Sequence, residues 1–211
     1  MGLIVKKKSG RTGLLGIWTL SAEDEMNPLL ANDPWLRERL GPISLPQRRL
    51  QIIGTHLLIR ELREGGSFRL NYDAYGRPGF EKAGPFISVS HTSKWVAVLM
   101  DEKAGCGIDI EIIGERIEKI HTKFMSDSER RNLSGTNRTE ELYVHWCAKE
   151  ALYKLHGEKN LHFSTDLLLE PFRYDGKGML SGKIRVRNNW VYHRLWYERM
   201  DDHMLVHIMN E

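Results

Sequence analysis

A short polar turn at the middle of the chain constrains the fold more than any other feature of the sequence. Residues 101–105 (Asp-Glu-Lys-Ala-Gly) separate two apolar runs typical of strands, at 95–100 and 106–112. Another such run, residues 86–90, precedes them across a short polar turn that contains His91. Strands therefore lie on both sides of a joint near the midpoint of the 211 residues.

Helical periodicity and capping residues predict helices between and after these strands. The expected helices cover residues 46–63, 127–133 and 140–156. Ser126 and Glu129 form a capping-box pattern before the second helix. The third helix follows Thr139 as its predicted N-cap and ends at Gly157.

The C-terminal fifty residues alternate apolar runs with turns, as antiparallel strands do. The expected strands there are residues 183–187, 192–197 and 204–209. We therefore predict an α+β fold of two similar α/β subdomains with mainly antiparallel sheets, related by a pseudo-twofold axis. The predicted boundary separates an N-terminal subdomain, residues 1–102, from a C-terminal subdomain, residues 103–211.

Charge is divided unevenly along the chain. Residues 1–100 carry 14 lysines and arginines against 9 aspartates and glutamates, whereas residues 101–211 carry 17 against 19. A basic half suits an anionic partner and an acidic half can bind a cation, although solvated surfaces explain the same charges.

Two cysteines and the absence of a long apolar stretch bear on location. Cys106 and Cys147 are too few for a disulfide framework and fit a reducing compartment. No secretory signal is evident at the start, and no run approaches the roughly 18 apolar residues of a membrane span. We expect a cytoplasmic protein without membrane or nucleic-acid partners.

The string Gly-Ile-Asp-Ile-Glu at residues 107–111 is the most informative for chemistry. On a strand, Asp109 and Glu111 share one face, while Ile108 and Ile110 point to the other. Two carboxylates about 4 Å apart repel by roughly 4 kcal/mol at an effective dielectric near 20, so the pair calls for a proton, a base or a cation. Oxygen ligands suit Mg²⁺. A solvated strand face explains the pair equally simply when it is taken alone.

Further polar pairs lie on either side of this string. Glu150 and Lys154 are four residues apart on one side of the third helix, which is the spacing of a surface ion pair. Trp146 fits the core, and Lys149 projects elsewhere on the helix. Upstream, Arg77 in a turn and the Ser90-His91 strand end are reasonable phosphate contacts, but each also fits an ordinary structural role.

Taken in order, these strings resemble the 4′-phosphopantetheinyl transferase superfamily, specifically its longer, Sfp-type branch. They read YGRP from Tyr75, SVSHT from Ser88, GIDIE from Gly107, F-x4-E from Phe124 to Glu129, and WCAKEALYK from Trp146. The resemblance covers residues 75–154, and Gln47-Arg48-Arg49 extends it upstream. It implies the pseudo-twofold fold of that family, acting as a monomer.

The resemblance also implies roles for the matching residues. Asp109, Glu111 and Glu150 would bind Mg²⁺, or Mn²⁺ in its place, with Glu150 also the general base. Lys154 would be catalytic and would contact the coenzyme A phosphates. The remaining coenzyme A contacts would be Arg48, Arg49, Arg77, Ser90 and His91.

The implied reaction transfers the 4′-phosphopantetheine of coenzyme A, the co-substrate, to a serine of an apo acyl or peptidyl carrier protein. Its products are the holo carrier protein and 3′,5′-ADP. Two residues depart from the pattern: Arg77 stands where Lys is usual, and Cys147 where Thr or Ser is usual. The N-terminal forty residues match poorly, so adenine contacts stay unassigned.

Two other functions fit parts of the same pattern. A Mg²⁺-dependent phosphodiesterase or nuclease also uses three carboxylates near basic groups. A coenzyme A or carrier-binding module without turnover needs only the binding residues. The joint presence of Asp109, Glu111, Glu150 and Lys154 favours the transferase over both.

Overall fold

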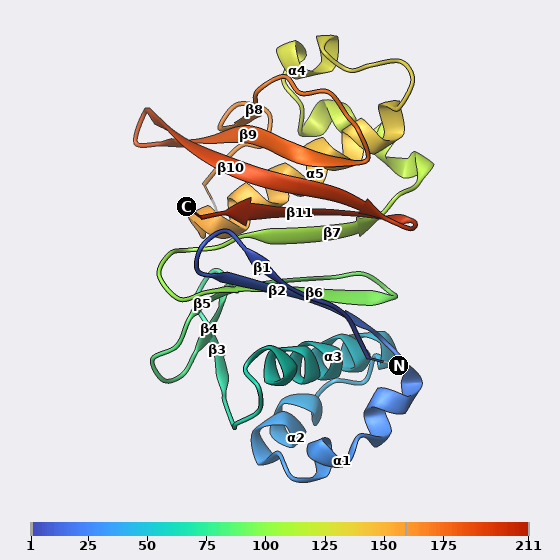
Figure 1. The fold of residues 1–211 in the computed structure, drawn as a ribbon, viewed down its shortest axis with the longest axis vertical. Helices are drawn as coiled ribbons and strands as arrows, with labels where there is room; N and C mark the ends of the chain where they lie inside the picture. The colour runs from blue at the N-terminus through green and yellow to red at the C-terminus, as the bar shows by residue number, and fades with distance from the viewer. Residues whose placement is uncertain (1, 159, 211) are drawn as a thin grey trace.

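Two antiparallel sheets form the centre of the protein, as a computed structural model that describes residues 2–158 and 160–210 shows (Figure 1). The first sheet has the strand order β1-β2-β6-β5, with strands Leu3–Ser9, Gly13–Thr19, Trp95–Asp101 and Phe86–His91. The second has the order β7-β11-β10-β9-β8, with strands Ile108–Ile112, His203–Met209, Asn189–Met200, Lys177–Val186 and Leu167–Leu169. The mixed helix and antiparallel-sheet composition predicted from the sequence is confirmed.

Short elements complete the first half of the chain. They are the 3₁₀ turn Ala22–Met26, helices α1 (Pro28–Ala31), α2 (Pro34–Leu40) and α3 (Pro46–Leu62), and the hairpin β3–β4 (Leu70–Tyr72 and Pro78–Phe80). In the second half, 3₁₀ turns Glu115–Lys119 and His121–Lys123 lead to α4 (Asp127–Arg131) and α5 (Arg138–His156). In Figure 1, α1 and α2 lie at the end of the molecule opposite α4.

Strand alternation in the first sheet builds two apolar faces. Val96 and Val98 of β6 pack against α3 through Leu58 and Leu62. A side chain at Gly16 of β2 would collide with the same two leucines, so this glycine allows α3 to approach the strand closely. The helix thus covers one face of the first sheet.

The other face of the first sheet packs against the second sheet. Leu15 and Leu99 meet Ile108, Ile110 and Leu205 in a shared cluster in which each is almost fully buried. Burying such a side chain contributes about 1.5–3 kcal/mol relative to leaving it exposed. The prediction that Ile108 and Ile110 face an apolar layer opposite the carboxylates is confirmed.

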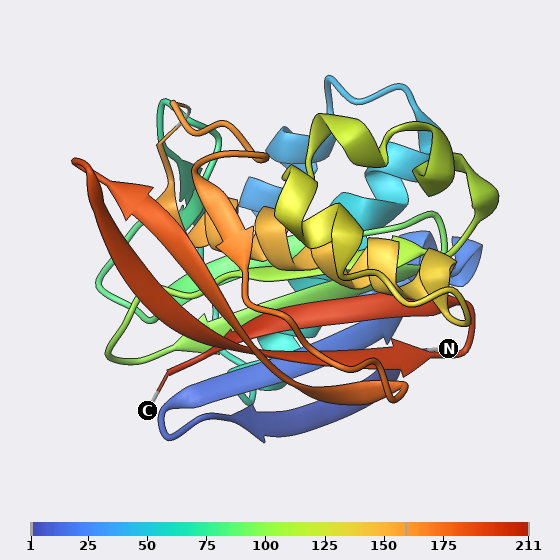
Figure 2. The ribbon, with the colours of Figure 1, turned by 90° about the horizontal axis from the view of Figure 1, so that it is seen from above.

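Helix α5 covers the far face of the second sheet (Figure 2). The buried side of this helix includes Leu142, Val144, Ala148 and Leu152. The helix ends at Gly157, whose backbone is left-handed as predicted. Its start differs from the prediction, because the N-cap is Asn137, which forms no side-chain cap bond, and Thr139 lies inside the helix. No helix in the described ranges is long and apolar enough to cross a membrane.

The two sheets meet along β5 and β7, which lie side by side at the predicted joint. Ser88 of β5 accepts a hydrogen bond from the Ile108 amide at 3.1 Å, and Ser90 donates to Asp109 at 2.7 Å. These buried bonds fix the first sheet against the start of β7. The division into subdomains at residue 102 and the internal duplication both stay predictions.

Two buried histidines are expected to make the fold acid-sensitive. Burial lowers the pKa of His145 and of His207 to about 4 each. In the unfolded chain the pKa of a histidine is near its ordinary value of 6.5, so below that pH the unfolded chain gains protons that the folded state excludes. Stability should therefore fall between pH 6.5 and pH 4, by about 2 kcal/mol per histidine from pH 7 to pH 5.

Urea unfolding of wild type and of His207→Gln at pH 7 and pH 5 measures this effect. The variant should lose less stability on acidification, because glutamine does not titrate but can still form a hydrogen bond with Ser9, which bonds His207 at 3.0 Å. Equal losses in the two proteins would contradict the assignment.

Candidate active site

Asp109 is the central residue of the candidate site. It lies on β7 with only 3% of its surface exposed, on the strand face directed toward α5. Its Oδ1 accepts hydrogen bonds from Ser90 at 2.7 Å and from Lys154 at 2.8 Å. Its Oδ2 is buried and has no hydrogen-bond partner among the described residues. One oxygen of this carboxylate thus lacks the partner that a buried charge normally has.

Lys154 links the end of α5 to β7. Its ammonium group donates to the backbone carbonyl of Ile108 at 3.0 Å as well as to Asp109. A lysine has three N–H donors, so these two bonds leave one for another acceptor. The motif residue Gly107 allows this approach, because a side chain there would collide with the backbone carbonyl of Ala151.

Glu111 is the second carboxylate on this strand face. Its Oε1 accepts a hydrogen bond from the indole N–H of Trp146 at 3.3 Å. Burial and the neighbouring Asp109 charge raise the pKa of Glu111. The Asp109 charge therefore disfavours the charged form of Glu111 in the absence of a cation, as expected from their shared face.

Glu150 faces the strand pair from α5. Burial, with help from the charges of Asp109 and Glu111, raises its pKa to about 7, although Lys154 acts in the opposite direction. A carboxyl group with a pKa near neutrality can take up and release a proton at physiological pH. The structure thus brings together the four residues Asp109, Glu111, Glu150 and Lys154.

The donor set fits a hard cation that is shared with a substrate. Within residues 2–158 and 160–210, no group of three or more carboxylate, imidazole or thiol side chains is arranged so that it could hold a metal ion by itself. Mg²⁺ seldom uses such a cage, because it is commonly held by one or two carboxylates, waters and substrate phosphates. The unpartnered Oδ2 of Asp109 and the raised pKa of Glu111 and of Glu150 are the features that a cation would relieve.

Arg48 and Arg49 are adjacent in sequence but lie in different surroundings. Arg48 donates to His91 Nε2 at 2.7 Å, so this ring nitrogen is the acceptor and the imidazole is neutral. Burial and the Arg48 charge lower the pKa of His91, in agreement with that form. Arg49 instead pairs with Glu25 and donates to the carbonyls of Leu40 and Ile43. Only Arg48 is placed beside His91.

Arg77 lies at the mouth of the site in the turn between β3 and β4. Its side chain pairs with Asp73 at 3.1 Å, and Asp73 also accepts bonds from the turn amides of Tyr75 and Arg77. The arginine and Lys154 line a common hollow of about 440 Å³. Arg77 is therefore held at the edge of the hollow that Lys154 also lines.

Cys147 and Glu129 are both buried but have different partners. The thiol of Cys147 donates to the Met204 carbonyl at 3.6 Å, and burial together with the nearby Asp109 charge raises its pKa well above the usual range. The cysteine thus lies close to Asp109. Glu129 caps α4 and contacts Lys149, on the side of α5 away from the carboxylates.

Trp146 is the contact that the sequence did not reveal. Helical spacing favoured a core position, yet the indole is only partly buried and donates to Glu111 across the gap between α5 and β7. Its position four residues before Glu150 is the one signal that places it on the same helix face.

Comparison with known proteins supports the motif assignment for part of the chain. Residues 105–185 match the family profile of the 4′-phosphopantetheinyl transferase superfamily. The matched segment contains Asp109, Glu111, Glu150 and Lys154, whereas Arg48, Arg77 and His91 lie outside it. The match does not distinguish the longer branch from the shorter one, so that assignment stays a prediction. A comparison with curated protein sequences found no match.

Proposed function

We propose that this protein transfers the 4′-phosphopantetheine arm of coenzyme A to a serine hydroxyl of an apo carrier protein. The observation that carries the proposal is that Lys154 bonds Asp109, that one buried oxygen of this carboxylate is unpartnered, and that the charge of Asp109 acts on both Glu111 and Glu150. The family match over residues 105–185, which contains this group, supports it. The reaction yields holo carrier protein and 3′,5′-ADP.

Asp109, Glu111 and Glu150 would hold Mg²⁺, or Mn²⁺ in its place. When bound, the cation supplies positive charge that binds the pyrophosphate and stabilises the negative charge developing on the leaving phosphate. Their different surroundings divide the carboxylates by role. Asp109 is fixed by Ser90 and Lys154 and serves as a rigid ligand, and Glu111 is oriented by Trp146.

Glu150 is the proposed general base. Its pKa of about 7 is close to the pH at which the reaction would run, which suits a group that accepts the proton of the attacking serine. The serine oxygen then forms its bond to the β-phosphorus while the bond to the bridging oxygen of the leaving 3′,5′-ADP breaks. Lys154 has an N–H donor left to stabilise that departing phosphate.

The basic groups around the site are the proposed nucleotide contacts. Arg48 and His91 lie together beside a hollow of about 160 Å³ that is also lined by Trp35 and Tyr72. Arg77 borders the hollow that Lys154 faces. These cationic groups would place the polyanionic end of coenzyme A so that its pyrophosphate reaches the carboxylates. Acyl and peptidyl carriers are both proposed as acceptors, with the protein acting as a monomer in the cytoplasm.

The proposed activity is tested by incubating the protein with coenzyme A, Mg²⁺ and a panel of apo acyl and peptidyl carriers. Mass spectrometry should detect carriers that gain one phosphopantetheine group, in amounts equal to the 3′,5′-ADP released. Release of 3′,5′-ADP without a modified carrier would instead indicate a phosphodiesterase. Coenzyme A binding without either product would indicate a binding module.

Replacing each of the two adjacent arginines in turn should separate a role in nucleotide binding from a role in stability. Arg48→Met should raise the KM for coenzyme A by about tenfold, because a charge-assisted hydrogen bond contributes about 1.5–3 kcal/mol. Arg49→Met should leave this KM unchanged and lower the melting temperature, because Arg49 holds Leu40, Ile43 and Glu25. An Arg48→Met enzyme with a KM within twofold of wild type would remove Arg48 from the nucleotide site.

A further inference from the structure

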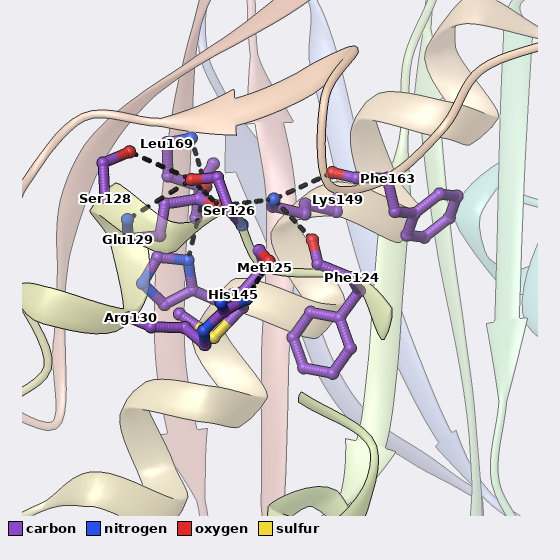
Figure 3. Close-up of polar contacts among 10 residues, drawn as sticks. All are labelled: Phe124, Met125, Ser126, Ser128, Glu129, Arg130, His145, Lys149, Phe163 and Leu169. Carbon is purple, nitrogen blue, oxygen red and sulfur yellow. Dashed lines mark hydrogen bonds and ion pairs between the residues drawn. The ribbon is translucent and has the colours of Figure 1, made fainter. Parts of the chain in front are cut away.

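Lys149 is a charged side chain that is completely buried, next in sequence to the proposed base Glu150. Its ammonium group makes three hydrogen bonds within the described structure, as Figure 3 shows. They run to the backbone carbonyl of Phe124 at 2.7 Å, to that of Phe163 at 2.9 Å, and to Glu129 at 2.8 Å. All three donors of the lysine are therefore used.

Glu129 is held as firmly as its partner. Its Oε2 accepts bonds from the amide and hydroxyl of Ser126, at 2.7 and 2.9 Å, and its Oε1 accepts the Leu169 amide at 2.9 Å. These donors and the Lys149 charge lower the pKa of Glu129 despite its burial. The pair thus joins α5 to α4, to β8 and to the two loops that contain Phe124 and Phe163 (Figure 3).

The two phenylalanines carry this constraint to the candidate active site. The Phe124 ring meets the Trp146 ring edge-on at 5.2 Å between centroids, and the Phe163 ring lies tilted against the same indole at 5.7 Å. Trp146 in turn donates its N–H to Glu111. Lys149 therefore fixes the backbone of the two residues whose rings flank the indole that orients a proposed metal ligand.

Stability alone is a poor reason for such an arrangement. Removing a lysine and a glutamate from water costs several kcal/mol each, and replacing a buried ion pair with apolar side chains of similar volume is often neutral or stabilising. The geometry instead gives the pair a specific task, because carbonyl oxygens 25 and 14 residues away in the chain are drawn to one ammonium group. Such an arrangement sets the positions of both rings at once.

We propose that Lys149, held by Glu129, is a positioning residue for transfer, acting through Phe124, Phe163 and Trp146 on the orientation of Glu111. The expected effect on kcat rests on the proposed function. The expected effect on metal affinity can be measured without a carrier protein. Residues that orient metal ligands in this indirect way typically contribute 10–100-fold to metal affinity or activity.

Lys149→Met keeps the length of the side chain and removes its three donors. We expect this variant to bind Mn²⁺ about 10-fold or more weakly by electron paramagnetic resonance, and to lower kcat by about 10–100-fold at saturating metal, with the KM for coenzyme A within about threefold. Leu180→Ala is the matched control, because it creates a cavity in the same core without touching the network. Both proteins are measured at a temperature at which circular dichroism shows them folded.

A double-mutant cycle tests the route through Trp146. Trp146→Phe keeps a ring between Phe124 and Phe163 but removes the N–H donor to Glu111. In that background Lys149→Met should lower Mn²⁺ affinity by less than about threefold, because residues that act through one contact are not additive. Leu180→Ala should have the same effect in both backgrounds.

Three results would decide the matter. A folded Lys149→Met protein with wild-type Mn²⁺ affinity and kcat would overturn the proposal. If the double variant loses Mn²⁺ affinity by the full product of the losses in Lys149→Met and Trp146→Phe, Lys149 does not act through Trp146. If Lys149→Met is too unstable to measure, Glu129→Gln, which keeps the side-chain shape, is expected to give a smaller loss of the same kind, and wild-type affinity would again overturn the proposal. Failure of the wild type to modify any carrier would remove the proposed function but leave the Mn²⁺ comparison intact.

Discussion

Asp109→Asn should lower the rate of phosphopantetheine transfer by about 1000-fold or more while the protein stays folded. The amide is nearly the same size and can still accept the Ser90 bond, so the packing of β7 should be preserved. It carries no charge, however, and its second polar atom becomes a donor in the position of the buried Oδ2. A cation would therefore lose its most rigid ligand, and Lys154 would lose its counter-charge.

The same substitution has a consequence that does not depend on activity. Asp109 is the nearby charge that contributes most to the raised pKa of Glu150, so in Asp109→Asn this pKa should fall from about 7 toward the ordinary glutamate value of 4.5. Nuclear magnetic resonance of the carboxyl carbon measures it in metal-free protein. Asp101→Asn is the control, because Asp101 is equally buried but bonds Thr12 and Asn210 outside the site. Transfer above a tenth of the wild-type rate in Asp109→Asn would exclude Asp109 from the site.

Local periodicity predicted the strand half of the candidate site. A period of two places Asp109 and Glu111 on one face, and the structure shows Ile108 and Ile110 in the apolar layer behind them. The polar turn after residue 100 also predicted where the chain passes from one sheet to the other. Such features depend on neighbours in sequence, so they can be read without knowledge of the tertiary structure.

Contacts between distant segments could not be predicted in the same way. The surroundings of Arg48 and Arg49 differ because Arg48 reaches His91 at the end of β5, whereas Arg49 reaches the carbonyls of Leu40 and Ile43. Likewise, the bond from Trp146 to Glu111 joins residues 35 apart in the chain, and its existence depends on how α5 crosses the sheet. Side-chain direction on a helix gives a face but not its neighbour.

The N-terminal hairpin β1–β2 was missed for a related reason. Its strands contain the basic run Lys6–Lys8 and two glycines, Gly13 and Gly16, which weaken the alternating pattern of a half-buried strand. β2 is nevertheless central to the first sheet because it pairs with both β1 and β6. Its burial is supplied by α3 and by the second sheet, which the local sequence does not encode.

Glu150→Gln should lower kcat by about 100–10,000-fold, which is the usual contribution of a positioned general base. In wild type, Mg²⁺ must bind a deprotonated Glu150, so the affinity of the protein for Mg²⁺ should rise with pH up to about 7 and then level off. Titration calorimetry at pH 6, 7 and 8 measures this rise. Glu150→Gln should bind Mg²⁺ more weakly at every pH and show a much smaller rise.

In metal-free protein, the raised pKa of Glu150 makes the folded state less stable as the pH rises. Because the pKa of Glu150 in the folded state is higher than the ordinary glutamate value of 4.5, the folded state keeps a proton that the unfolded chain loses between pH 4.5 and 7. Wild type therefore loses stability as pH rises through that window, and Glu150→Gln should be more stable than wild type at pH 8, by on the order of 1–3 kcal/mol, but not at pH 5. Glu140→Gln, on the same helix and paired with Arg199, should give no such gain. If Glu150→Gln changes stability equally at pH 5 and pH 8, the pKa of Glu150 is not raised by its surroundings. Its assignment as the general base would then fail.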